Sequence, residues 1–93
     1  MRTIERSTLF RRDYKRAAKG PYRAALDDDL VPVLVALSSD ELLAPRHRDH
    51  ALSGDWSGYR ECHIKPDLLL IYRKPDEETL WLVRLGSHSE LFG

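Results

Sequence analysis

Three histidines and one aspartate lie at or near the ends of strand-like segments in the second half of the chain. They are His50 in "RDHAL", His63 and Asp67 in "CHIKPD", and His88 in "GSHSELFG". Histidine both takes and gives protons near neutral pH. RNA cleavage without a metal needs a base for the ribose 2′-hydroxyl and an acid for the departing 5′-oxygen. The spacing alone does not show that these residues form a catalytic site, because each histidine could be structural and Asp67 could simply close a turn.

A metal-binding interpretation of this region is weaker. His47, His50, Cys62 and His63 invite it, but the chain has no CxxC or HxxxH pair, and a structural zinc needs four converging ligands. Adjacent strand residues point to opposite faces, so Cys62 and His63 cannot easily serve one site, whereas Glu61 shares a face with His63. We therefore expect no metal and no cofactor, with His47 as a loop histidine and Cys62 as a buried small hydrophobe.

Length and composition predict a single domain over residues 1–93. The chain has 93 residues, 42% of them hydrophobic, enough for one modest core. Its lone cysteine cannot form an internal disulfide, and its first ten residues contain no apolar run typical of a signal peptide. No segment is long and apolar enough for a membrane span. These features predict a soluble cytoplasmic protein with no membrane partner.

The charges are unevenly distributed although the net charge is zero. Residues 1–23 carry eight lysines and arginines against two acids, and residues 27–41 carry five acids and no lysine or arginine. Local charge steers a polyanion, so the basic end is a possible RNA contact. An ordinary solvated surface is the alternative.

The elements that must position these residues follow from periodicity and turn signals. We expect a strand at 2–6 and an amphipathic helix at 7–19, capped by Ser7 or Thr8. A second helical segment should run to about residue 38, with a break at 27–29 that leaves Pro32 in a first turn. The basic face of the first helix comprises Arg11, Arg12, Lys15, Arg16 and Lys19.

The rest of the chain should be a loop followed by strands. Residues 38–50, "SSDELLAPRHRDH", lack apolar periodicity and contain Pro45. From residue 58, "GYRECHI", "LLLIYR" and "TLWLVRL" indicate three strands, the first two joined at "KPD". The predicted fold class is therefore α+β, with the N-terminal strand and two helices packed on one face of a mainly antiparallel four-stranded sheet.

Two linked motifs resemble the YafQ branch of the RelE superfamily of bacterial toxins. They are "DHALSGDWSGYRECHIKPDLLLIYR" and "LVRLGSHSELFG", which match the family patterns H-x-L-x-G-x-W-x-G-x-R-[DE]-x-H-[IV]-x-P-D-x-x-L-I-Y and R-x-G-[ST]-H-x-x-L-F. The resemblance is close in the second half of the chain. In the first half it extends to length, helix pattern and the basic first helix.

The resemblance implies a RelE-like fold and a ribosome-dependent mRNA endonuclease that acts without metal. The expected partners are mRNA on the ribosome, ribosomal RNA and a cognate antitoxin, with DNA contacted only through the antitoxin complex. The alternatives are a non-catalytic RelE-like binding component of a toxin–antitoxin repressor complex, and an RNase that needs no ribosome.

Matching positions carry the family's active residues to this chain. The implied catalytic residues are His50, His63, Asp67 and His88, with Phe92 contacting substrate. We assign His50 as base and His88 as acid, with His63 and Asp67 placing the scissile nucleotide, although these roles could be exchanged.

The evidence for further substrate-contacting residues is weaker. Phe92 could stack under an unpaired base or merely plug the sheet. Arg84 and Arg60 are further candidates for phosphate contact, and Glu61 stands where the pattern allows Asp or Glu. Trp56 is expected to anchor a turn.

Overall fold

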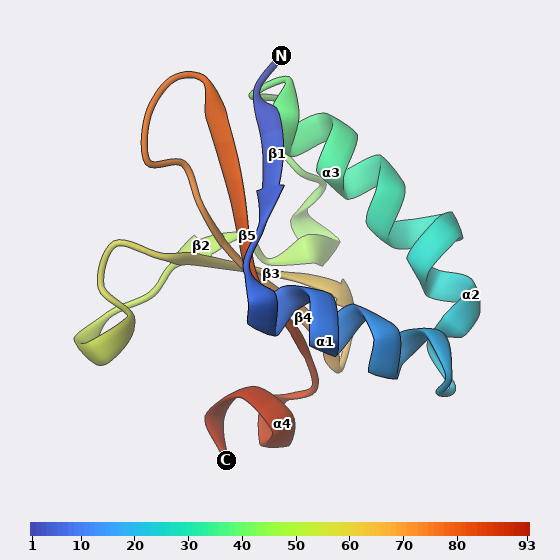
Figure 1. Cartoon of the computed structure of the whole chain (residues 1–93). Coiled ribbons are helices and arrows are strands. Elements are labelled where there is room, and N and C mark those ends of the chain that lie inside the picture. The colour runs from blue at the N-terminus through green and yellow to red at the C-terminus, as the bar shows by residue number, and fades with distance from the viewer.

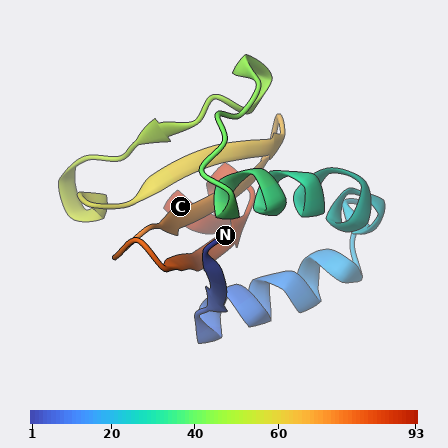
Figure 2. The same cartoon turned by 90° about the horizontal axis from the view of Figure 1, so that it is seen from above.

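The computed structural model describes all 93 residues and contains a five-stranded sheet with strand order β1-β5-β4-β3-β2. β1 and β5 pair in parallel, and the other neighbours are antiparallel. Figure 2 shows β2 at the edge beyond β3. The strands are β1 (Thr3–Arg6), β2 (His50–Ala51), β3 (Arg60–Lys65), β4 (Leu68–Arg73) and β5 (Thr79–Gly86).

Two helical segments separate β1 from the rest of the sheet, as expected. Ser7 caps α1 by accepting a hydrogen bond from the Phe10 amide at 2.9 Å. The break expected at residues 27–29 is a π-helical turn, and Pro32 lies in the first turn of α3, where no internal amide partner is needed. The helical elements are α1 (Thr8–Ala18), α2 (Arg23–Ala25), η1 (Leu26–Leu30), α3 (Val31–Ser38), η2 (Pro45–His47), η3 (Gly54–Trp56) and α4 (His88–Phe92).

The two faces of the sheet bury different clusters. α1 and α3 lie on one face (Figure 1), where the main core forms around Phe10, Leu37 and alternate residues of β3, β4 and β5. A smaller cluster of Leu69, Ile71 and Leu91 fills the other face. Leu91 belongs to α4, so this short helix covers the face that the long helices leave free.

The α+β class and the N-terminal strand followed by two helices on one face agree with the prediction, whereas the parallel pairing of β1 and the short helix α4 on the other face were not predicted. The predicted four strands are one too few, because His50 and Ala51 pair with Glu61 and Arg60 and add β2 to the edge. A two-residue strand carries too little periodicity to be recognised in a sequence. None of the helices has the length and apolarity needed to cross a membrane.

Candidate active site

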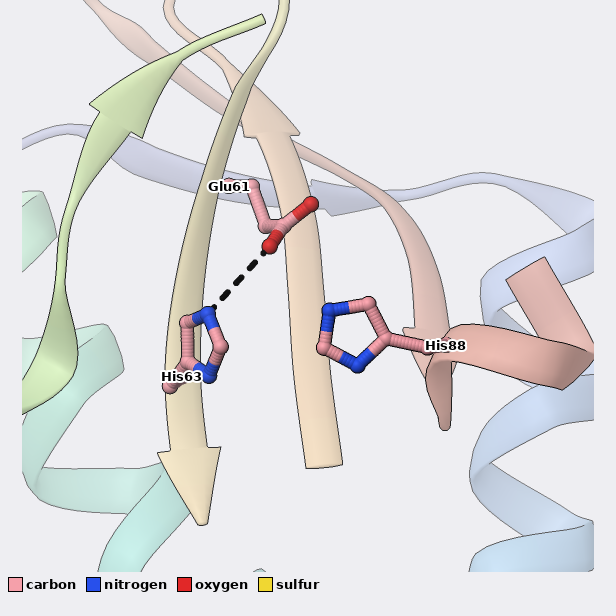
Figure 3. Close-up of side chains that lie close together, drawn as sticks. All are labelled: Glu61, His63 and His88. Atoms are coloured by element: carbon pink, nitrogen blue, oxygen red, sulfur yellow. Dashed lines mark ion pairs between the residues drawn. The ribbon is translucent and has the colours of Figure 1, made fainter. Parts of the chain in front are cut away.

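β3 presents the first site residues on the face away from α1 and α3. Cys62 and Ile64 point into the main core, so alternation directs Glu61 and His63 to the other face. Glu61 is buried, and its Oε1 lies 3.4 Å from His63 Nε2 (Figure 3). His63 Nδ1 lies 3.2 Å from the Pro66 carbonyl oxygen. Both ring nitrogens thus face oxygen acceptors, which the imidazolium form satisfies with two N–H donors.

α4 brings His88 to the same place from the end of the chain. Ser87 caps this helix, and Glu90 closes a capping box with the Ser87 amide. His88 is the first residue of α4, and its ring centroid lies 5.8 Å from that of His63. Its side chain is 58% exposed, so the ring is accessible to substrate.

Asp67 orients His88 through two contacts. Its Oδ1 accepts hydrogen bonds from the His88 amide and from His88 Nδ1, both at 3.1 Å. The amide bond, followed by the ring bond and the positive fields of His88 and His63, holds the pKa of Asp67 below its usual value. Since Nδ1 donates to the carboxylate, the other ring nitrogen, which points toward Glu61 in Figure 3, is available for proton transfer.

His50 lies on the same face from the neighbouring strand. It pairs with Glu61 across β2 and β3, and directly paired residues project to one side of a sheet. Its Nδ1 donates to the Arg48 carbonyl oxygen at 2.6 Å, which leaves Nε2 unprotonated in the neutral ring. No hydrogen bond joins His50 to the other histidines. The structure therefore binds Asp67 to His88, places the His63 ring beside that of His88, and places His50 beside Glu61.

Phe92 extends this face at the last turn of α4. Its ring centroid lies 6.5 Å from that of His88 and 6.1 Å from that of Trp56, with an edge-to-face angle of 77° to the indole. Trp56 also meets Tyr59 edge to face at 5.4 Å. Phe92 remains 44% exposed. Trp56 thus acts as an anchor, as expected, while one surface of Phe92 is open to a ligand.

Arg84 has a partner on the helix side of the sheet. Its Nε donates to Asp13 Oδ2 at 2.7 Å and its Nη2 to Asp13 Oδ1 at 3.2 Å. Burial raises the pKa of Asp13, but the Arg84 and Leu85 hydrogen bonds together with the charges of Arg84 and Arg16 outweigh it, and the net pKa is lowered. The predicted phosphate contact of Arg84 gains no support from this geometry.

Arg60 also lies apart from the histidines. Strand alternation places it on the opposite face from His63, and its Nε is 3.3 Å from the Tyr72 hydroxyl and 3.4 Å from Asp49 Oδ1. Arg60 thus contacts Tyr72 of β4 and Asp49 next to β2, and this geometry does not support the predicted substrate contact.

The basic face of α1 is divided between two roles. Arg16 pairs with Asp13 at 3.0 Å and with Glu90 of α4 at 2.9 Å, so it ties α1 to the helix that carries His88. Gly86 permits this approach, because a Cβ there would lie 2.9 Å from Glu90 Oε1. The other four cations are exposed and form no ion pair; they are Arg11, Arg12, Lys15 and Lys19.

Two further residues, Glu61 and His47, contribute to the site and were not among its predicted members. The Glu61 carboxylate backs His63, and strand alternation already indicated their shared face. His47 is buried, and its Nδ1 donates to the His63 carbonyl oxygen at 2.7 Å. The expectation of an ordinary loop histidine was therefore incomplete. No local signal predicts this contact, which spans 16 residues.

Glu61, His63 and His88 could also hold a metal ion. One ligand atom from each lies within 4.8 Å of the others (Figure 3). One carboxylate oxygen and two imidazole nitrogens are donors that zinc and copper accept. The site therefore offers both proton-transfer groups and an incomplete ligand set.

Comparisons with known proteins identify the family and the fold. A family model for the bacterial YafQ toxin of type II toxin–antitoxin systems matches residues 2–93. The mRNA interferase toxin YafQ of Escherichia coli K12 is 38% identical over 93 residues, which cover 99% of this chain and 97% of that protein.

Solved structures share the fold. The metal-bound toxin of Helicobacter pylori superposes with a TM-score of 0.83 at 46% identity, covering 99% of this chain and all of that one. YafQ in the E. coli DinJ–YafQ complex superposes with a TM-score of 0.83 at 36% identity, and the match covers all of both chains.

Proposed function

The chain belongs to the YafQ family of bacterial toxins of type II toxin–antitoxin systems, and from that membership we propose that it is an endoribonuclease that cuts messenger RNA in the decoding site of the ribosome. A cognate antitoxin would neutralise it, and DNA would be contacted only through that complex. Its relative in E. coli is named an mRNA interferase, and another structure holds YafQ with DinJ. We place this activity in the cytoplasm, within one RelE-like domain.

The observation that carries the proposal is a pair of imidazoles with carboxylate partners on one open sheet face. The rings of His63 and His88 lie 5.8 Å apart, with Glu61 beside the first and Asp67 bound to the second. Carboxylates stabilise the cationic rings that proton transfer requires. A structural role alone does not explain two exposed or half-buried imidazoles held in this way.

The proposed reaction divides proton transfer between two histidines. His50 Nε2 takes the proton of the ribose 2′-hydroxyl, and the 2′-oxygen attacks phosphorus. His88 donates a proton to the departing 5′-oxygen, so that a 2′,3′-cyclic phosphate and a 5′-hydroxyl end are formed. His63 supplies positive charge to the crowded phosphate, and Asp67 keeps the His88 ring in place.

Substrate and ribosome contacts surround this centre. Phe92 stacks under an unpaired base. The exposed cations of α1 contact ribosomal RNA, where a basic face lowers the cost of approaching phosphates. Arg16 already forms ion pairs with Asp13 and Glu90, so we assign it a mainly structural role instead of a contact with ribosomal RNA.

Histidine replacement tests the assignment. His88→Gln and His50→Ala should each lower cleavage of message on purified ribosomes by about 10²- to 10⁴-fold, the usual contribution of a proton-transfer group. Melting temperatures should change little, since both side chains are exposed. The exposed Glu77→Gln provides a remote control.

Three results would change the proposal. Cleavage unaffected by both histidine variants would remove the active-site assignment. Binding of antitoxin by a wild-type chain that never cuts message on ribosomes would favour the non-catalytic alternative. Equal cleavage of naked RNA would favour an RNase that needs no ribosome.

We also propose that cleavage needs no metal. Reaction rates on ribosomes cannot be followed in excess chelator without disturbing magnesium, so the test uses the isolated toxin dialysed against EDTA before mixing. Unchanged single-turnover rates are expected. A loss that zinc or copper restores would instead assign the Glu61, His63 and His88 ligand set to catalysis.

A further inference from the structure

A polar pocket lies next to His63 at the edge of β3. Beyond its short pairing with β2, this edge is contacted by η2, which packs against β3. The pocket has a volume of about 360 Å³. We call it the edge pocket, and its lining residues are Asp29, Arg46, His47, Arg48, His63, Ile64, Lys65 and Pro66.

The edge pocket has a surplus of positive charge. Three cations line it against the single carboxylate of Asp29, which pairs with Lys65 at 3.1 Å. Arg46 and Arg48 are exposed, and neither has a carboxylate partner. Two guanidinium groups beside a hollow present planar donor sets suited to phosphate oxygens.

The loop that carries these arginines is fixed to the active site. His47 donates to the His63 carbonyl oxygen at 2.7 Å, and the Arg48 carbonyl oxygen accepts from His50 at 2.6 Å. Arg48 has φ 46° and ψ 44°, a left-handed conformation that is uncommon outside glycine. Such residues cluster at functional sites. One short loop thus holds two histidines and also forms the pocket.

We propose that the edge pocket binds a phosphate of the message next to the one that is cut. Arg46 and Arg48 hold that phosphate, while His63, which lines the pocket, faces the scissile group. The proposal rests on the proposed function and adds a subsite to it. Its consequence is that the strand enters the active site in a fixed register, because two consecutive phosphates are held at once.

Two sets of experiments test the subsite. One removes an arginine charge from the protein, and the other removes a phosphate charge from the message. Arg46→Gln removes one guanidinium, and Arg48→Asn does so with a residue that tolerates the left-handed conformation. Lys74→Gln, in the turn between β4 and β5 and outside the basic end of residues 1–23, is the control for loss of one positive charge. Each edge-pocket variant should lower kcat/KM on ribosomes by about tenfold, since hydrogen bonds to charged groups contribute at this level.

Messages with one neutral methylphosphonate then locate the phosphate. At one position beside the cut, the neutral linkage should lower wild-type kcat/KM about tenfold and have little further effect on Arg46→Gln. At other positions the wild type and the variant should respond alike. Contact with ribosomal RNA predicts another result: an equal loss for every message and a parallel loss of ribosome affinity. That result, or unchanged kcat/KM in both variants, would overturn the subsite.

Direct binding separates this proposal from the proposed function. A short oligoribonucleotide with a 2′-deoxy sugar at the cut should shift the backbone amide signals of residues 46–48 and 65 in the wild type, and shift them less in Arg46→Gln. If those shifts appear in a chain that never cleaves message, the subsite stands and the nuclease assignment fails. If the chain cleaves but these amides do not respond, the subsite fails alone.

Discussion

The individual catalytic candidates differ in how their protons are held. His50 donates Nδ1–H to a carbonyl and keeps Nε2 as an acceptor, which suits a base. His88 donates Nδ1–H to Asp67, whose pKa is lowered first by the His88 amide hydrogen bond. A carboxylate that stays ionised stabilises the protonated ring, which suits an acid. Hydrogen bonding thus favours the division of roles that we assigned from the sequence, with His50 as base and His88 as acid.

Phe92 provides a test of stacking at the residue scale. Phe92→Leu retains apolar contact with Trp56 but removes the aromatic face, so kcat/KM should fall by about 5- to 150-fold, corresponding to ~1 to 3 kcal/mol for base stacking. The melting temperature should stay close to that of the wild type. Phe92→Tyr should retain activity. A Leu variant with full activity would identify Phe92 as a hydrophobic plug only.

At the element scale, α1 does more than cover the core. Its buried Asp13 binds Arg84 and the Leu85 amide of β5, and its Arg16 binds Glu90 of α4. These contacts fix the end of β5 from which α4 begins. Since His88 is the first residue of α4, the position of the ring that we propose as the acid depends on ion pairs made by α1.

Asp13→Asn should weaken the fold in a pH-dependent way. Leaving Arg84 without its buried partner should lower the free energy of unfolding by roughly 3 kcal/mol at neutral pH. The folded-state pKa of Asp13 is depressed, so its stabilising contribution is present above the unfolded-state pKa and is lost as pH falls through the folded-state pKa.

Urea denaturation at neutral and acidic pH measures this difference. The gap between wild type and Asp13→Asn should be largest near neutral pH and shrink under acid conditions. The exposed Asp55→Asn serves as the control. A gap independent of pH would show that the ionised carboxylate is not the stabilising group.

The whole molecule separates its charges although their sum is zero. Four unpaired cations of α1 lie on the helix side of the sheet, whereas His50, His63 and His88 lie on the other face. β5 and α4 connect the two regions through Arg84 and Glu90. A molecule arranged in this way can contact ribosomal RNA with one surface and the message with another.

Salt dependence tests that arrangement. Replacing the four free cations of α1 with Gln should reduce the slope of log affinity for ribosomes against log salt by roughly 0.7 to 0.9 for each phosphate that the helix no longer neutralises. The intrinsic cleavage rate at saturating ribosomes should change little. An unchanged slope would show that this face does not contact RNA; the residues replaced are Arg11, Arg12, Lys15 and Lys19.

Apart from β2 and α4, the main strands and helices were predictable from the sequence, as were the capped first helix, the irregularity near residues 27–29 and the shared face of Glu61 and His63. These features depend on local capping, periodicity and alternation, which are visible in neighbouring residues. Motif matching supplied the family and the candidate residues, including His88.

The way in which these residues combine depends on contacts between distant parts of the chain. Asp67 meets His88 across 21 residues, Asp13 meets Arg84 across 71, and His47 meets His63 across 16. β2 forms only because the edge of β3 is available for pairing. Such contacts depend on strand register and on helix placement, which no local pattern specifies. For that reason the sequence could name the histidines but could not reveal that the loop holding two of them also forms the edge pocket.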